Sequence, residues 1–164
     1  MKTIFVRDLP KRKMNVVREF AAPLKHVWKA WTDSELLDQW WAPEPWKAVT
    51  KTMDFREGGH WLYYMKGPDG TQSYARADYK TINPLKSFEG LDAFCDASGT
   101  INTEFPRMHW NVRFMETPSG TKVDIDITFA SEADLMKIAE LGFEEGFTMA
   151  HGNLDKLLSK QLVA

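Results

Sequence analysis

The sequence contains one cysteine, Cys95, and no long apolar run. A single cysteine cannot form an internal disulfide or a thiolate metal cluster. No stretch approaches the ~18 consecutive apolar residues that would span a bilayer, and residues 1–13 contain no apolar segment of signal-peptide length. We therefore expect a reduced, cytoplasmic protein without a membrane span.

An excess of charge of one sign is also lacking. The 164 residues include 21 Lys and Arg against 23 Asp and Glu, which leaves a formal net charge of −2. Proteins that bind nucleic acid usually carry a clear basic excess, so we expect no nucleic-acid partner. The length suits one domain, and the 43% of hydrophobic residues can fill a sizeable core.

The common motifs of metal and catalytic sites are missing as well. No HExxH, paired CxxC, GxSxG or glycine-rich phosphate loop occurs. The four histidines are too scattered to indicate a zinc site: His26, His60, His109 and His151. We therefore predict no catalytic residue, no cofactor and no bound metal, which favours a binding protein over an enzyme.

Hydrophobic periodicity predicts one α+β domain over residues 14–164, preceded by residues 1–13 as an N-terminal arm or a loosely attached first strand. The expected elements, in chain order, are a strand at 14–20, two short helices at 24–31 and 34–41, strands near 47–54, 61–65, 73–80, 86–94, 108–114 and 122–129, a short helix after Ser131 and a long helix from 143. The long helix carries a continuous apolar stripe. It must bury that stripe on the concave face of the sheet, which gives two layers.

Large rings and small side chains are expected to face each other across a central hairpin. Residues 67–70, Gly-Pro-Asp-Gly, predict the turn. Trp61 and Tyr63 on one strand then oppose three small inward residues on the next strand: Ser73, Ala75 and Ala77. This combination can leave volume that no side chain fills.

Aromatic residues are abundant, with seven Trp and ten Phe. They predict either a thick core or an apolar pocket walled by rings. If a pocket exists, we expect its ligand-binding residues to be Trp61, Tyr63, Met65, Tyr79, Trp110, Phe143, Phe147 and His151. A pocket of this kind would take a small hydrophobic or amphipathic molecule.

Several separated motifs resemble one known family. They are Val-Arg-Glu-Phe-Ala-Ala-Pro at 17–23, Val-Trp-Lys-Ala-Trp-Thr-Asp at 27–33, Trp-Trp-Ala-Pro at 40–43, the hairpin around 58–70, the acidic turn at 92–99 and the segment 141–158. In order and spacing they resemble the activator-of-heat-shock-protein-90-ATPase-like family of the SRPBCC (START/Bet v 1-like) superfamily, over residues 14 to about 160.

The resemblance implies a helix-grip fold, in which a curved antiparallel sheet of six to seven strands wraps round the long C-terminal helix and often encloses an apolar cavity. In such a fold the tryptophan-rich helix pair would form the cavity mouth, with Trp28, Trp40 and Trp41. Exposed rings there would instead mark a surface for a protein partner or for a second copy of the chain. Superfamily members include ligand carriers, cyclases and co-chaperone domains, so the fold alone does not assign an activity.

Two polar residues have alternative interpretations. Asp92 is either a solvated surface residue, the interpretation that we favour, or an inward residue that must be hydrogen-bonded or have a raised pKa. His151, four residues after Phe147, is either a structural histidine at the edge of the core or a polar anchor for a ligand. His60, His109, Asp124 and Asp126 are expected outside the core.

Three functions follow, in order of preference. The first is binding of a small hydrophobic or amphipathic ligand between the sheet and the C-terminal helix. The second is a co-chaperone-like interaction module with a filled core. The third, a cyclase or hydratase, would need two ionisable groups that converge in the cavity, and only Asp92 and His151 are candidates.

Overall fold

One antiparallel sheet of eight strands forms the frame of the molecule in the computed structural model, which describes residues 2–163. The strands lie in the order β1-β2-β8-β7-β6-β5-β4-β3. Their bounds are β1 Ile4–Asp8, β2 Lys13–Phe20, β3 Lys47–Met53, β4 His60–Lys66, β5 Gln72–Asn83, β6 Ser87–Cys95, β7 Met108–Thr117 and β8 Gly120–Thr128. The helices are α1 Leu24–Thr32, α2 Ser34–Trp40, α3 Glu132–Glu140 and α4 Phe143–Val163.

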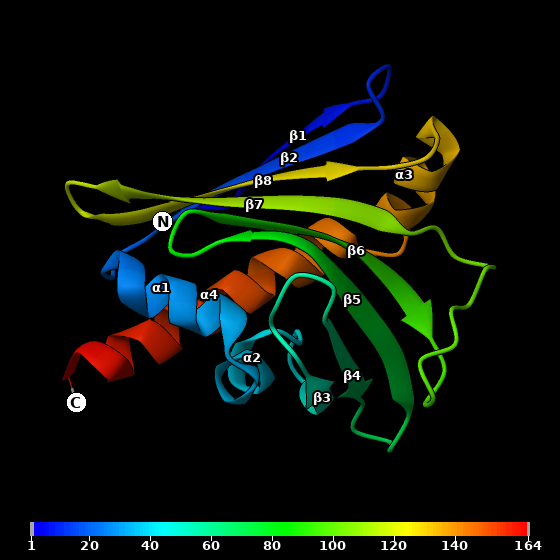
Figure 1. Ribbon diagram of the computed structural model, residues 1–164, viewed down its shortest axis with the longest axis horizontal. Coiled ribbons are helices and arrows are strands. Elements are labelled where there is room, and N and C mark those ends of the chain that lie inside the picture. Colours follow the sequence, from blue (N-terminus) through cyan, green and yellow to red (C-terminus); the bar gives the residue numbers. More distant parts are fainter. Residues whose placement is uncertain (1, 164) are drawn as a thin grey trace.

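The sheet curves round α4, as Figure 1 shows. Strands β1, β2, β8 and β7 pass above the helix, while β5, β4 and β3 turn down beside it (Figure 1). The pair α1 and α2 contacts α4, and α2 also packs against β3 (Figure 1). This arrangement confirms the predicted α+β helix-grip fold, with the core between the sheet and its helices.

The sheet has eight strands, one more than the upper end of the expected range of six to seven. Residues 4–8 form β1, which pairs antiparallel with β2 over five residues. The segment that we expected as an arm or a loosely attached strand therefore contributes the edge of the sheet. Met1 and Ala164, the outer ends of the two predicted segments, lie outside the described residues.

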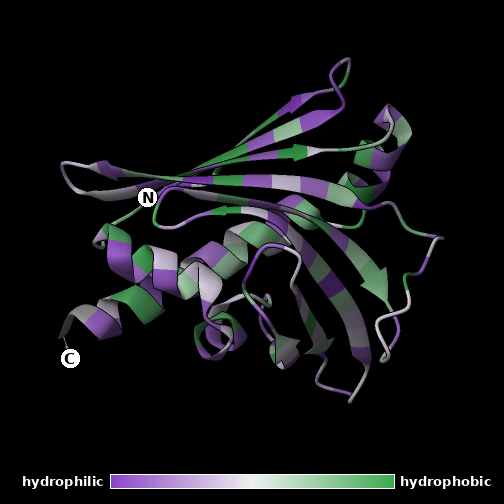
Figure 2. Cartoon of the chain, viewed as in Figure 1, coloured by the Kyte–Doolittle hydropathy of each residue, from purple (hydrophilic) through white to green (hydrophobic). Residues whose placement is uncertain are grey.

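Period-two alternation decides which side chains the sheet buries, and Figure 2 shows it as bands of opposite hydropathy along the strands. In β7 and β8 the residues predicted to face inward are buried: Met108, Trp110, Val112, Phe114, Val123, Ile125 and Ile127. Thr121 of β8 is buried with them. Burial of this many large apolar side chains is the main favourable term in folding.

Local signals begin two of the helices and turn one hairpin where the sequence predicts. The Asp33 side chain accepts a hydrogen bond from the backbone N–H of Glu35 at 2.9 Å and caps α2. The Ser131 hydroxyl accepts one from the N–H of Asp134 at 3.1 Å and caps α3. At the β4–β5 hairpin Gly70 has φ +88°, a conformation that glycine adopts without strain.

The alternation pattern did not anticipate a buried cation on the inward face of β2. Arg18 is only 5% exposed, and its guanidinium pairs bidentately with Asp155 of α4. It also lies over the ring of Phe20, 4.8 Å from the centroid. An arginine can occupy such a position because its planar group satisfies a carboxylate and a ring face together.

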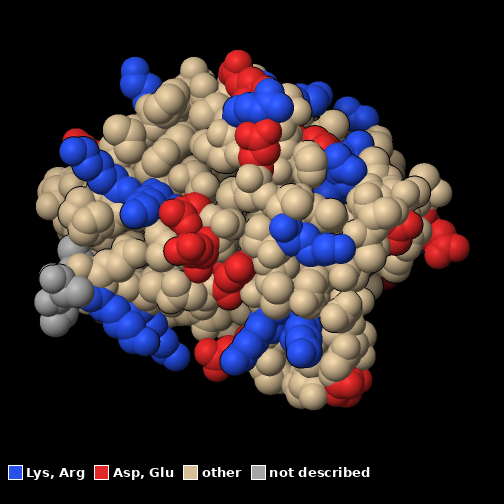
Figure 3. All heavy atoms as spheres, turned by 60° about the horizontal axis from the view of Figure 1, so that its bottom comes forward, with Lys and Arg blue, Asp and Glu red and all other residues tan. Residues whose placement is uncertain are grey.

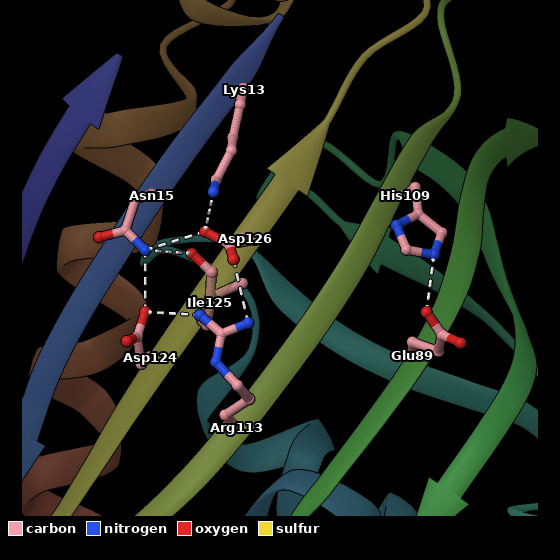
Figure 4. Close-up of polar contacts among 8 residues, drawn as sticks. All are labelled: Lys13, Asn15, Glu89, His109, Arg113, Asp124, Ile125 and Asp126. Atoms are coloured by element: carbon pink, nitrogen blue, oxygen red, sulfur yellow. Dashed lines mark hydrogen bonds and ion pairs between the residues drawn. The ribbon is translucent and has the colours of Figure 1, made fainter. Parts of the chain in front are cut away.

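The outer face of the sheet is a network of paired polar groups, as Figure 4 shows. The Asn15 amide donates to Asp124 at 2.8 Å and to Asp126 at 3.0 Å, and Arg113 forms ion pairs with both carboxylates. His109 contacts Glu89 at 3.0 Å on the same face. The predicted outward orientation of Asp124, Asp126 and His109 is confirmed.

Charges of both signs are interspersed on the surface that Figure 3 presents. Neither sign forms a continuous field there, in agreement with the small net charge. Among the helices of residues 2–163, none combines the length and apolar character that a membrane crossing needs.

Candidate functional site

A cavity of about 250 Å³ lies between the concave face of the sheet and the N-terminal part of α4. Strands β4 to β7 form one wall, and the end of α3, the start of α4 and the segment after α2 form the other. Its lining is almost entirely apolar: Trp41, Pro43, Tyr63, Met65, Ser73, Ala75, Asp92, Ala93, Phe94, Met108, Trp110, Ile138, Leu141, Gly142, Phe143, Gly146 and Phe147.

A second, smaller cavity of about 60 Å³ adjoins the first. It extends toward the helix pair, where Trp31 and Leu37 line it. Four residues line both cavities and therefore lie at their junction: Trp41, Tyr63, Asp92 and Trp110. We refer to the 250 Å³ space as the main cavity.

The register of the β4–β5 hairpin explains the unfilled volume. Tyr63 is paired with Ala75, and Trp61 with Ala77. Because β5 supplies methyl groups where β4 supplies rings, space remains on the concave side of the hairpin. Each cavity is thus lined by one of the predicted pairs of a large and a small side chain: Tyr63 and Ala75 line the main cavity, and Trp61 and Ala77 line the smaller one.

The aromatic walls hold one another in place. The rings of Trp61 and Tyr63 stack with centroids 3.9 Å apart. The indole N–H of Trp41 donates to the Tyr63 hydroxyl at 2.9 Å, and that of Trp61 donates to the Thr50 hydroxyl at 3.0 Å. Trp110 meets Phe147 of α4 edge to face, with centroids 5.6 Å apart. These contacts fix the shape of the lining.

Asp92 points inward from β6 into the junction of the two cavities, so the favoured surface interpretation is wrong. The Trp110 indole N–H donates to one carboxylate oxygen at 2.8 Å, and the Met108 backbone N–H donates to the other at 2.9 Å. Two fixed donors make an inward carboxylate tolerable, which the alternation pattern alone could not reveal.

Burial dominates the protonation equilibrium of Asp92. Desolvation raises its pKa from 3.8 to about 7, although the two N–H donors and the Arg107 charge act in the opposite direction. Burial also raises the pKa of the Tyr63 hydroxyl, and the negative charge of Asp92 adds to that shift. The main cavity is therefore lined by one carboxyl group that titrates near neutral pH, Asp92, and one phenol that stays protonated, Tyr63.

Most of the predicted ligand-binding residues line one of the two cavities. Tyr63, Met65, Trp110, Phe143 and Phe147 line the main cavity, whereas Trp61 and Tyr79 line the smaller one. Of the predicted mouth residues only Trp41 lines them. Trp40 is fully buried and donates to the Ala30 carbonyl, and Trp28 packs against Phe55, Phe88 and Phe114.

His151 lines neither cavity. It is 1% exposed, and its ring packs against Phe147 with centroids 4.1 Å apart. Its Nδ1 is 2.9 Å from the Thr3 hydroxyl, while Nε2 has no hydrogen-bond partner among the described residues. Burial, with a smaller contribution from Arg18, lowers its pKa from 6.5 to about 3. This placement agrees with the structural interpretation of His151.

Several lining residues were not predicted, among them Pro43, Phe94, Met108 and Gly146. Asp92 and Phe94 share the inward face of β6 with Phe88 and Gly90, a pattern visible in the sequence. The signal was present but ambiguous, because the other face of β6 also carries the apolar Leu91 and Ala93.

Comparison with known proteins identifies the family. The profile described as "Activator of Hsp90 ATPase homolog 1-like protein" matches residues 21–159. The chain belongs to this family, which is part of the SRPBCC superfamily. A search of curated proteins gave no significant match.

Solved structures agree with the Activator of Hsp90 ATPase homolog 1-like assignment. A protein from Arthrobacter aurescens is 35% identical with a TM-score of 0.90, covering 96% of this chain and 91% of that one. Protein Ms6760 from Mycobacterium smegmatis is 30% identical with a TM-score of 0.88, and the match covers 96% of this chain and 97% of that one. The AHSA1 protein from Silicibacter pomeroyi is 20% identical, with a TM-score of 0.71, and the match covers 91% of this chain and 99% of that one. It supports the fold alone.

Proposed function

We propose that this chain binds a small apolar or amphipathic molecule in the main cavity. The observation that carries the proposal is an apolar space of about 250 Å³ with one carboxyl group at its inner end. Concave apolar sites with few polar groups are typical of small-molecule binding. Burial of ligand surface would contribute roughly 25 cal/mol per Å² before the costs of association.

The two alternatives have less support. A co-chaperone-like module without a ligand predicts a filled core, whereas the described residues leave two adjoining cavities. A cyclase or hydratase needs two ionisable groups that converge. Asp92 lines the cavities, but His151 lies behind Phe147 and carries no charge near neutral pH.

Native mass spectrometry of the freshly purified chain tests the proposal. We expect a bound mass that is present under native conditions and disappears on denaturation. If the protein carries no additional mass, the same measurement is repeated after incubation with a library of apolar and aromatic compounds. Bare protein in both experiments would contradict ligand binding.

A cavity-filling variant tests the location. Ala75 lines the main cavity from β5, so Ala75→Leu places three further carbon atoms in the space that a ligand would occupy. We expect at least a tenfold loss of affinity for a bound compound, with no loss of folding stability. Ala133→Leu, at an exposed position of α3, is the matched control and should bind normally. Equal affinity of both variants would place the ligand elsewhere.

A further inference from the structure

Within residues 2–163, the lining of the two cavities contains an acidic side chain but no basic one. Asp92 is the one acidic residue in their lining, and no Lys, Arg or His among the described residues lines either of them. A ligand that enters the main cavity therefore meets a carboxyl group without a cationic side chain beside it in the same space. The ligand's own charge must suit that environment.

The Asp92 carboxylate keeps acceptor capacity for a ligand. Each oxygen accepts one N–H, from Met108 or from Trp110, and a carboxylate can accept about four hydrogen bonds. Arg107, the cation whose charge acts on Asp92, has other hydrogen-bond acceptors than the Asp92 carboxylate. Its guanidinium donates to the Asp92 backbone carbonyl at 3.0 Å and to the Asp78 carboxylate at 2.9 Å.

The remaining walls are also suited to positive charge. Trp41, Tyr63 and Trp110 line the junction together with Asp92, and Phe147 lines the main cavity beside them. Faces of aromatic rings carry negative potential and attract ammonium groups, most strongly where water is excluded. A carboxylate among aromatic rings is a chemical environment that favours an organic cation over a neutral molecule of equal size.

We propose that the main cavity selects an amine with an apolar body, whose ammonium group lies at Asp92 among Trp41, Tyr63 and Trp110. This inference rests on the proposed binding function and narrows its ligand class. An anionic head group, such as that of a fatty acid, is disfavoured at this position because it would lie against Asp92 without a counter-ion.

Three probes of matched length test the inference: 4-phenylbutylamine, 4-phenylbutan-1-ol and 4-phenylbutyrate. Their affinities are measured at pH 8 by titration, monitored through the indole N–H signals in two-dimensional NMR spectra. The Trp110 and Trp41 indoles report directly, because they donate to Asp92 and to Tyr63. We expect the amine to bind at least tenfold more tightly than the alcohol, and the carboxylate to bind most weakly.

The outcomes separate this inference from the proposed function. Equal binding of the three probes at the Trp110 signal would overturn amine selection and leave the binding function standing. If none of the probes shifts the Trp41 or Trp110 signals, both are contradicted. Tighter binding of the carboxylate probe would overturn amine selection outright.

Asp92→Asn should remove the preference, bringing the ratio of amine to alcohol affinity close to one while the alcohol still binds.

If the Asp92→Asn variant does not fold, the pH dependence of ligand binding to the native chain tests the inference. Only the ionised form of Asp92 attracts the ammonium group, so amine affinity should rise about tenfold from pH 6 to pH 8, while alcohol affinity stays constant. Burial raises the pKa of Tyr63 well above this range, so its phenol stays protonated at both pH values, and Arg107 acts on Asp92 as a positive charge. A flat amine profile would overturn the inference.

Discussion

At the residue scale, burial perturbs Asp92 and His151 with opposite effects on stability. The folded chain has a pKa of about 7 at Asp92, against 3.8 for the free carboxyl group. Between pH 4 and 7 the folded state therefore holds one proton more than the unfolded state. Its stability falls as the pH rises through this window, by up to about 1.4 kcal/mol per pH unit, and is not affected further above pH 7.

Asp92→Asn should reveal this dependence. At pH 5 we expect the variant to be less stable by about 1–3 kcal/mol, because an amide nitrogen cannot accept the second of the two N–H donors. At pH 8 the substitution also removes a buried negative charge, so the deficit should shrink by about 2–3 kcal/mol. Urea denaturation at both pH values measures it, and an unchanged deficit would contradict an inward, titrating Asp92.

His151 provides the comparison with the opposite sign. Its pKa of about 3 means that the unfolded state, which titrates near 6.5, binds the proton first as the pH falls. Stability from this residue is therefore lost below pH 6.5, the window in which Asp92 has the reverse effect. In the same denaturation series, His151→Gln should lose less stability than the native chain between pH 6.5 and 4.

At the element scale, the edge strand β1 is bound to α4 as well as to β2. Thr3, just before β1, contacts His151 through its hydroxyl, and Arg7 of β1 forms an ion pair with Glu144 at 2.6 Å. The Arg7 pair is partly exposed and contributes little. The Thr3 contact matters more, because it is the hydrogen bond that the structure shows for the buried imidazole.

Thr3→Val tests this contact with a side chain of nearly equal shape. The variant leaves both ring nitrogens of His151 without a partner, so we expect a loss of about 1–3 kcal/mol in the free energy of unfolding. Thr52→Val, at an exposed position of β3, is the control and should change stability by less than about 0.5 kcal/mol. Equal effects of the two substitutions in urea denaturation would show that β1 does not secure His151.

At the scale of the whole molecule, β1 leaves an apolar edge on the sheet. Ile4 is 55% exposed and Val6 is 56% exposed, and unpaired backbone groups of an edge strand can pair with another chain. The exposed large apolar side chains on strands include these two and Met115 of β7, whereas none of those among the described residues lies on the tryptophan-rich helix pair.

We therefore predict reversible self-association of the chain through β1 at high concentration. Val6→Lys should give a monomer over the whole concentration range, because a charged edge opposes strand pairing. Met149→Lys, at an exposed position of α4, should behave like the native chain. Sedimentation velocity across a concentration series measures this, and a native chain that stays monomeric throughout would contradict the prediction.

The sequence by itself determined the elements from residue 14 onward and many of the aromatic and small residues around the cavities. Strand alternation, the Gly-Pro-Asp-Gly turn and the helix caps depend on neighbours in the chain, so they can be derived from spacing alone. The opposition of rings to small residues across the β4–β5 hairpin follows from register in the same way.

Only the tertiary structure decided the inner face of β6, the place of β1 and the side of Phe147 on which His151 lies. Both faces of β6 mix polar and apolar residues, so alternation groups Asp92 with Phe94 but does not say that their face is inward. The inward position of Asp92 depends on N–H donors from β7, a strand that joins β6 only in the folded sheet. Contacts between segments that are distant in the chain follow from packing, which spacing along one strand does not encode.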